Sequence, residues 1–404
     1  MLHEKRIVLG VTGGIAVYKA AELVRELVRR GAVVRVVMTD HACEFVRPLT
    51  FETLSGHPVS ADLFHLTGGY EIDHIALADF AELVVIAPAT ANIIGKLAAG
   101  IADDLLTTVL LAATAPVLIC PAMNAKMYAN AVVKENEARL MARGYAVLVP
   151  AYGELACRTE GQGRLPEALE IAEEIEFLLS PKTLQGEHIL ITAGPTQEPF
   201  DPVRYITNHS SGKMGYALAV MARRRGAAVT LISGPTELPA PRGVRCISVQ
   251  TALEMRDSVL DHLKEATVVI KAAAVADYRP KVCQKTKIKK TAGQMTVSLE
   301  RNPDIIAAIG EKKGSRIVVG FAMESDHLLE NARTKLVEKK MDFIVANDLT
   351  MPGAGFRADT NIIRILDSKG GDETFPLMDK LDAAGIILDR VKERRVAKRT
   401  RDGR

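Results

Sequence analysis

The sequence predicts an α/β protein with two three-layer domains, each built on a mainly parallel sheet. Short apolar runs that suit buried strands alternate with longer segments that suit helices, and this alternation is typical of parallel sheets covered by helices on both faces. Hydrophobic residues make up 48% of the chain, aromatic residues make up only 4% and tryptophan is absent, so the cores must be aliphatic. At 404 residues the chain has room for two or three domains of ordinary size.

The first half of the chain consists of repeated strand and helix patterns. A strand is predicted over residues 6–12, a Gly13-Gly14 turn follows it, and a helix is predicted over residues 15–30. By itself this turn is either a nucleotide or flavin site or a tight structural turn, because it lacks the full GxGxxG spacing. Ligands are expected at the carboxyl ends of the strands. Further strands are predicted over residues 33–38, 83–87, 117–120 and 146–149.

The second half opens with ILITAGPTQEPFDPVRYITNHSSGKMG, residues 189–215. A buried strand breaks at Gly194-Pro195, a polar loop follows, and Lys213 leads into an alanine-rich helical pattern. Free backbone N–H groups and the helix dipole would point at this turn, so the segment predicts an anion site. The elements predicted after it are strands over residues 228–232, 244–248, 268–272 and 361–366, and helices over residues 213–225, 253–263 and 380–390.

A helix predicted over residues 166–179 separates the two halves. No Gly/Ser-rich linker follows it, so we place the domain boundary near residue 186, with domains over residues 1–186 and 187–390. Residues 390–404 contain eight Lys or Arg against two Asp or Glu, and we expect residues 391–404 to form a basic, disordered tail. The remainder of the chain is slightly acidic, which argues against a nucleic-acid-binding surface.

The five cysteines contain no CxxC pair that would indicate a zinc or redox site. Reduced thiols in a cytoplasmic protein are therefore expected. No apolar run approaches the roughly 20 residues that span a bilayer. The charged residues and apolar run at the start are interpreted as a first strand, because the run breaks at Gly13-Gly14.

The first half carries VTGGIA, MTDHA, HIALA, APATAN, DDLLTT, PAMNAKMY and LACRTEGQGRL in this order. Together these motifs resemble the flavin-dependent cysteine decarboxylases. The resemblance implies a flavodoxin-like domain that binds flavin mononucleotide (FMN). It places the cofactor near Gly13, Gly14, Ile15, Thr39, Thr90, Ala91, Asn92 and Ala122.

Four further residues fall on the active-site positions of this family: His74, Asn124, Met127 and Cys157. Imidazole titrates near neutral pH, which suits His74 to act as a base, although a lone histidine is more often a surface residue. Asn124 suits a carboxylate or amide contact, or else a helix N-cap. Cys157 is expected to act as an acid in a glycine-rich loop. Arg158 stands where the family usually has Gly, Leu165 where Met is common, and Tyr128 where Trp is frequent.

The segment over residues 189–215 resembles the opening of the phosphopantothenate–cysteine ligase domain. AVADYRP followed by KIKK continues the resemblance, which implies a Rossmann-like domain that uses CTP and Mg²⁺. Asn208 and Lys287 are the implied catalytic residues, and Asp277 is the candidate metal ligand. The implied substrate-binding positions are Arg204, Lys271, Ala272, Ala273, Ala274, Asp277, Lys287, Pro303, Asp304, Ile305, Ile306, Phe321, Lys335 and Lys339.

Residue patterns alone leave several of these positions open. The lysines between residues 281 and 290 form either a solvated loop or an electrostatic clamp on a triphosphate. Phe321 is either an ordinary core residue or the lining of a base pocket. Lys335 and Lys339 share a helical face, where like charges repel unless a polyanion lies between them.

The resemblance therefore implies a bifunctional enzyme of coenzyme A biosynthesis. The second half would join 4′-phosphopantothenate to L-cysteine through an acyl-cytidylate, and the first half would decarboxylate the product to 4′-phosphopantetheine. Flavin-domain trimers and ligase-domain dimers, combined into a dodecamer, are implied as well. Two alternatives remain: a flavoprotein without catalysis, and an NAD-type oxidoreductase with an acidic residue after its second strand.

Overall fold

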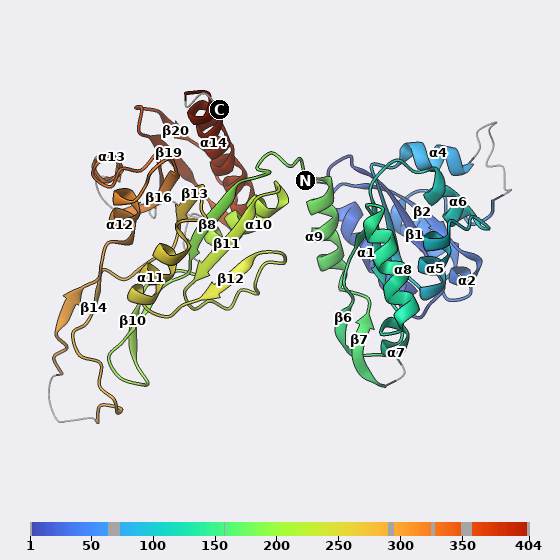
Figure 1. Ribbon diagram of the computed structural model, residues 1–404, viewed down its shortest axis with the longest axis horizontal. Helices are drawn as coiled ribbons and strands as arrows, with labels where there is room; N and C mark the ends of the chain where they lie inside the picture. Colours follow the sequence, from blue (N-terminus) through green and yellow to red (C-terminus); the bar gives the residue numbers. More distant parts are fainter. Residues whose placement is uncertain are drawn as a thin grey trace. The chain divides into compact units, whose positions relative to one another are not determined.

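The computed structural model describes residues 2–63, 73–156, 158–289, 295–324, 328–348 and 358–401. The chain divides into two compact units, Met1–Ser180 and Pro181–Arg404, so the division falls a few residues before the boundary predicted near residue 186. Each unit is a sheet covered by helices (Figure 1). The predicted class, two α/β domains with mainly parallel sheets, is confirmed.

The first unit is built on a parallel five-stranded sheet with the order β2-β1-β3-β4-β5. This is the flavodoxin-like order of doubly wound sheets, in which ligands bind where the order reverses, between β1 and β3. The strands are buried because their Val, Ile and Leu side chains face helices on both sides. Their bounds are β1 (Arg6–Val11), β2 (Val33–Met38), β3 (Leu83–Ala89), β4 (Val117–Pro121) and β5 (Ala146–Val147).

Helices cover both faces of this sheet. One face packs on α1 (Val17–Arg29), α3 (Pro48–Ser55) and α9 (Ala168–Leu179). The opposite face packs on α4 (Asp73–Phe80), α5 (Ala91–Ala99), α6 (Leu105–Ala112) and α8 (Ala131–Ala142). The remaining elements are two short helices, α2 (Asp40–Cys43) and α7 (Ala125–Tyr128), and an antiparallel hairpin of β6 (Ala151–Glu154) and β7 (Glu160–Arg164).

The second unit has an eight-stranded sheet with the order β12-β11-β8-β13-β16-β17-β19-β20. The strands are parallel from β12 to β17, and β19 and β20 add an antiparallel edge. Counted from β8, the parallel part has the Rossmann order, which reverses between β8 and β13. The bounds are β8 (His188–Ala193), β11 (Ala228–Ser233), β12 (Arg245–Ser248), β13 (Val268–Lys271), β16 (Ile317–Glu324), β17 (Phe343–Asp348), β19 (Ile363–Asp367) and β20 (Asp372–Thr374).

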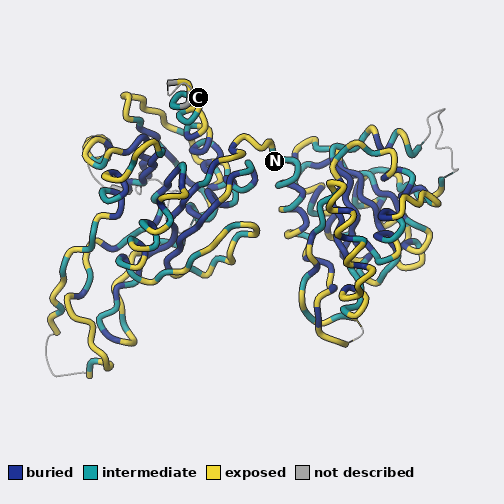
Figure 2. The backbone as a smooth tube through the Cα atoms, in the orientation of Figure 1, coloured by how far each residue is buried: buried dark blue, intermediate teal, exposed yellow. Residues whose placement is uncertain are grey.

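Two layers of helices enclose this sheet, and Figure 2 shows its strands as the most buried part of the unit. Helices α10 (Lys213–Arg224) and α14 (Lys380–Arg401) cover one face, and α11 (Ala252–His262), α12 (Ile305–Glu311) and α13 (Leu328–Glu338) cover the other. Three antiparallel ribbons extend from the unit: β9 (Gln197–Pro199) with β10 (Tyr205–Thr207), β14 (Tyr278–Pro280) with β15 (Leu299–Arg301), and β18 (Thr360–Asn361) with β21 (Met378–Asp379). Within the described residues, no helix is long and apolar enough to cross a membrane.

The prediction that residues 391–404 form a disordered tail is wrong for residues 391–401, because α14 continues to Arg401. Basic residues of this helix pair with two buried carboxylates that lie just before β17 and β8. Asp342 is 2% exposed and accepts Arg394 at 3.4 Å, Lys398 at 3.3 Å and Lys313 at 2.8 Å. Similarly, Arg395 lies 3.0 Å from the carboxylate of Glu187, which is also buried. The sequence shows the positive charges of this helix, but it does not show that they pair with Asp342 and Glu187, which lie far away in the chain.

This arrangement predicts that the last turns of α14 stabilise the second unit. Replacing Arg394 and Lys398 together by Gln should lower the free energy of unfolding by about 2 kcal/mol, because part of the charge pairing of buried Asp342 is lost. Denaturant unfolding of the full chain measures the effect. The matched control is the exposed Lys392→Gln, which should change little. Equal stability of the double variant and the control would contradict the prediction.

Candidate active sites

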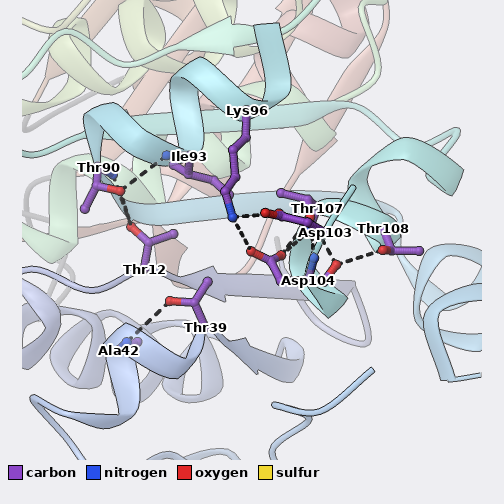
Figure 3. Close-up of polar contacts among 10 residues, drawn as sticks. All are labelled: Thr12, Thr39, Ala42, Thr90, Ile93, Lys96, Asp103, Asp104, Thr107 and Thr108. Carbon is purple, nitrogen blue, oxygen red and sulfur yellow. Dashed lines mark hydrogen bonds and ion pairs between the residues drawn. The ribbon is translucent and has the colours of Figure 1, made fainter. Parts of the chain in front are cut away.

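The carboxyl edge of the first sheet is held together by threonine hydroxyls at the point where the strand order reverses. Thr12, buried at the end of β1, donates to the Pro88 carbonyl at 2.7 Å and accepts the Thr90 N–H at 3.1 Å. Figure 3 shows the hydroxyls of Thr12 and Thr90 facing each other, and that of Thr90 also caps α5 through the Ile93 N–H. The loops after β1 and β3 are therefore fixed relative to each other.

A cavity of about 710 Å³ opens beside these loops. It is formed by the turn before α1, the start of α5, the region of α7 and the β6–β7 hairpin. Seven of the predicted site residues line it: Gly14, Ile15, Thr90, Ala91, Ala122, Asn124 and Met127.

The lining of this cavity fits a flavin mononucleotide. Helix α1 begins without a side-chain cap at Ala16, and the positive end of its dipole suits a phosphate. Ile15, Tyr18 and Met127 are exposed apolar side chains at the cavity, 61%, 56% and 49% exposed, and suit the faces of a ring system. A Cβ atom on Gly13 would collide with His41, so this turn requires glycine.

Other predicted residues of the first half are not among the described residues that line the cavity. Thr39 caps α2 through the Ala42 N–H at 3.3 Å, and the acidic residue that follows it, Asp40, lies in the first turn of that helix. Asn92 lies in the first turn of α5, and His74 lies near the start of α4, which packs against α6. Cys157 lies outside the described residues.

The hairpin beside the cavity explains why glycine suits position 158. Arg158 has φ of 61°, in the left-handed region, and its N–H donates to the Leu155 carbonyl at 2.8 Å. The Leu155 N–H donates to the Thr159 carbonyl at 2.9 Å. Hairpin loops of this pattern place a left-handed residue before the second strand, and a side chain there costs about 1 kcal/mol relative to Gly. Arg158 therefore keeps the turn but strains it.

The other two residues that depart from the family pattern, Leu165 and Tyr128, are both buried. Leu165 is 2% exposed and belongs to the core around α1 and α9. Tyr128 is also buried, and the Lys134 ammonium lies 3.0 Å from the centre of its ring.

Sequence reasoning missed a charged group in the wall of the cavity. Lys19 is 8% exposed and its ammonium lies 2.9 Å from the Glu167 carboxylate, which Arg164 also contacts at 2.7 Å. The hydrogen bond from Lys19 lowers the pKa of Glu167, although burial opposes this effect. The available signal was a lysine on the otherwise apolar face of α1.

The DDLLTT motif has a local structural role. The Asp104 carboxylate accepts the Thr107 N–H at 2.8 Å and forms a capping box at the start of α6. Lys96 donates to Asp103 at 2.6 Å and to Asp104 at 3.1 Å, as Figure 3 shows. The hydrogen bond to Asp103 raises the pKa of Lys96, although burial opposes it.

At the reversal point of the second sheet, buried threonines hold the loop after β13 against the loop after β8. Thr192 accepts the Ala273 N–H at 3.2 Å, and Thr196 accepts the Ala276 N–H at 3.0 Å. The Ala274 N–H in turn donates to the Gly194 carbonyl at 2.9 Å. The family resemblance pointed to Ala273 and Ala274, but not to Ala276 or to the two threonines.

Asn208 reaches the same loop, because its amide donates to the Ala274 carbonyl at 3.0 Å. The following helix, α10, begins at Gly212 with φ of 78° and no side-chain cap, as the predicted anion site requires. Asp277 is exposed beyond the alanines, where it suits a metal held mainly by phosphate oxygens. No cluster of three metal-ligating side chains occurs among the residues that the structure describes.

Charged residues gather at the end of β13. Burial lowers the pKa of Lys271 to about 8, with Lys339 and Lys335 adding to the effect and Asp304 and Asp277 opposing it. Lys339 lies 2.8 Å from Asp304, which also caps α12. The structure thus brings together five residues that were predicted separately.

The remaining predicted residues of the second half differ in accessibility. Ile305 and Ile306 lie in the first turn of α12 and are buried in the core. Phe321 is partly buried against the core on the face of the sheet that α10 covers. Pro303 precedes α12, and Ala272 follows β13, both partly exposed. Lys287 is exposed, whereas the guanidinium of Arg204 is held by Asp201.

Both halves of the chain match known protein families. Residues 1–180 match the Flavoprotein family, and residues 184–394 match the DNA/pantothenate metabolism flavoprotein C-terminal domain. The chain is 50% identical over 395 residues to the Coenzyme A biosynthesis bifunctional protein CoaBC of Bacillus subtilis, covering 97% of each chain. It is 48% identical over 395 residues to CoaBC of Vibrio cholerae, covering 97% of this chain and 99% of that protein.

Among solved structures, the C-terminal domain of a Coenzyme A biosynthesis bifunctional protein CoaBC is 42% identical, with a TM-score of 0.46, and covers 52% of this chain and 97% of that one. The full-length relatives establish the family without it. The chain belongs to the family of bifunctional coenzyme A biosynthesis proteins.

Proposed function

We propose that this chain carries out two consecutive steps of coenzyme A biosynthesis. The second half condenses 4′-phosphopantothenate with L-cysteine at the expense of CTP, and the first half decarboxylates 4′-phosphopantothenoylcysteine to 4′-phosphopantetheine with FMN. The observation that carries the proposal is the pairing of two doubly wound sheets, each with groups suited to an anion at its reversal point, in a chain that matches the bifunctional relatives over 97% of its length.

In the first half, bound FMN supplies the two-electron redox chemistry that makes loss of CO₂ feasible. Gly14 and Ile15 belong to the turn that would hold its phosphate. The side-chain oxygen of Asn124 accepts the Lys126 N–H at 2.8 Å. This contact fixes the Asn124 amide beside the cavity, where it can bind the substrate carboxylate or amide. His74 acts as the base toward the thiol, and Cys157 returns a proton to the product.

In the second half, the chain must neutralise a triphosphate and activate a carboxylate. Attack of the carboxylate on the α-phosphate releases pyrophosphate and gives an acyl-cytidylate, from which the cysteine amine displaces CMP. The lysines near β13 balance the phosphate charge. Asn208, held at the Ala274 carbonyl, polarises the acyl group in the second step. Asp277 would help to hold Mg²⁺, which would balance the charge of the nucleotide phosphates.

The proposed assembly is a cytoplasmic homo-oligomer, a dodecamer of flavin-domain trimers and ligase-domain dimers, with the flavin at a subunit boundary. His74 is consistent with this arrangement, because it belongs to α4 and is not among the described residues lining the cavity of its own chain. No nucleic acid or membrane partner is proposed.

Mass spectrometry of reaction mixtures tests the function directly. The purified protein should be yellow and should convert 4′-phosphopantothenate and cysteine into 4′-phosphopantetheine when CTP is added, with release of pyrophosphate, CMP and CO₂. Replacing CTP by ATP should sharply reduce the first step. Synthetic 4′-phosphopantothenoylcysteine isolates the flavin half. A colourless protein that releases neither pyrophosphate nor CO₂ would overturn the proposal.

Asn208→Asp should separate the two steps of the ligase. A carboxylate beside the Ala274 carbonyl cannot donate, so pyrophosphate release should continue while amide formation falls about a hundredfold and acyl-cytidylate accumulates. Asn130→Asp is the matched control, because Asp caps α8 as well as Asn does. Wild-type amide formation in Asn208→Asp would exclude the proposed role.

Lys271 should make nucleotide use depend on pH. Its pKa of about 8 means that a positive charge near the phosphates is lost above pH 8, so KM for CTP should rise about tenfold between pH 7 and pH 9.5. Since the folded pKa lies below the unfolded value, protonated Lys271 also costs stability at lower pH, and this cost disappears as the pH rises.

Steady-state kinetics across this pH range measure the dependence on Lys271. In Lys271→Gln, KM should be high and nearly independent of pH, whereas the exposed Lys264→Gln should behave as wild type. A rise in KM that persists in Lys271→Gln would assign the titration to another group.

A further inference from the structure

The lysine-bearing segment after β14 is docked on the loop between β9 and β10. Lys287 and Lys289 are exposed, and Ile288 between them is partly buried. The Gln284 N–H donates to the Phe200 carbonyl at 3.0 Å, and this contact fixes the segment three residues before Lys287. The segment that carries the exposed lysines is therefore anchored to the loop between β9 and β10.

Asp201 is the centre of this contact. Its carboxylate is 1% exposed and accepts the N–H groups of Val203 at 2.9 Å, Arg204 at 2.8 Å and Ile288 at 3.2 Å. Burial by itself raises the pKa of Asp201, but these hydrogen bonds and the Arg204 guanidinium lower it to about 2. The carboxylate is consequently ionised at every pH at which the enzyme would work.

Arg204 completes the contact from the other side. Its guanidinium donates to Asp201 at 2.7 and 3.1 Å and to the Ile288 carbonyl at 2.9 Å, and it lies over the Phe200 ring at 5.5 Å. Both the N–H and the carbonyl of Ile288 are thereby held. Consecutive Cα atoms are about 3.8 Å apart, so fixing Ile288 restricts the backbone of both neighbouring lysines.

The contacts of Arg204 favour a positioning role. Its charge is balanced by a buried carboxylate, and its Nε and one terminal nitrogen donate to Asp201 and Ile288. A guanidinium bound in this way provides orientation, whereas the exposed ammonium groups beside it provide net positive charge.

We infer that Asp201 and Arg204 form a clasp that positions Lys287 and Lys289 against the nucleotide phosphates, and that Arg204 acts through these lysines rather than by touching the substrate. The inference rests on the proposed ligase function and deepens it. It makes Asp201, which lies in the motif over residues 189–215 but was not among the predicted site residues, a positioning residue for the nucleotide-activation step.

A mutant cycle tests the clasp in the full-length enzyme. Asp201→Asn should lower kcat/KM for CTP in pyrophosphate release about tenfold or more, because the charge-assisted bonds to Arg204 are lost. In a background that carries both Lys287→Gln and Lys289→Gln, the same change should have less than about a twofold effect, because the residues it positions are already gone. Additive losses would show that Asp201 does not act through these lysines.

Arg204→Lys distinguishes the clasp from direct contact. Lysine keeps the charge but cannot bridge Asp201 and Ile288 in a planar fork, so the clasp predicts a loss similar to that of Asp201→Asn. If Arg204 contacted the substrate itself, Asp201→Asn would leave its charge available and activity would be retained. That outcome overturns the inference.

Two further measurements separate positioning from misfolding and from failure of the proposed function. Trypsin should cleave after Lys285, Lys287 or Lys289 several times faster in Asp201→Asn than in wild type, and this readout requires no activity. Decarboxylation by the flavin half and the matched exposed control Asp257→Asn should remain at wild-type rates. Unchanged cleavage of these bonds in Asp201→Asn would also overturn the clasp.

Discussion

Both candidate sites depend on one constraint, the hydrogen bonding that joins two diverging loops where the order of a parallel sheet reverses. At this point neighbouring strands send their connections to opposite faces, which leaves a crevice between them. In the first unit, Thr12 ties the loop after β1 to the loop after β3. In the second, Thr192 and Thr196 tie the loop after β8 to the alanines after β13. Without these contacts, backbone groups from the two loops would not hold a common ligand.

Much of the framework was predictable because it is local. Apolar runs between glycine turns identified the central strands, and the strand predicted over residues 33–38 has the observed bounds. Turn chemistry identified the loops at both reversal points, and seven flavin-half residues predicted from the motifs line one cavity. The strands and turns follow from short sequence windows, in which hydrophobic period and glycine placement are sufficient, whereas the cavity residues follow from the family resemblance.

What could not be predicted depends on partners far away in the sequence. The basic residues after position 390 were predicted to form a disordered tail, yet they lie in a helix, and two of them pair with Asp342 about fifty residues earlier. Arg204 read as a substrate ligand, but its guanidinium is held at Asp201 and Ile288. Arg158 was visible as a departure from the family, but its left-handed backbone was not, because φ follows from the closure of the hairpin.

The distribution of paired and exposed charge suggests how one chain handles phosphorylated substrates in two chemically different sites. In the flavin half, Lys19 and Arg164 both pair with Glu167 in the cavity wall, so their positive charge is partly balanced. In the ligase half, Asp201 and Arg204 form a neutral pair, but the lysines they support remain exposed. A triphosphate that must be bound and then released as pyrophosphate requires positive charge that is oriented without being buried, because burial lowers the pKa of an ammonium group, as it does for Lys271. A neutral clasp beneath exposed lysines meets both requirements.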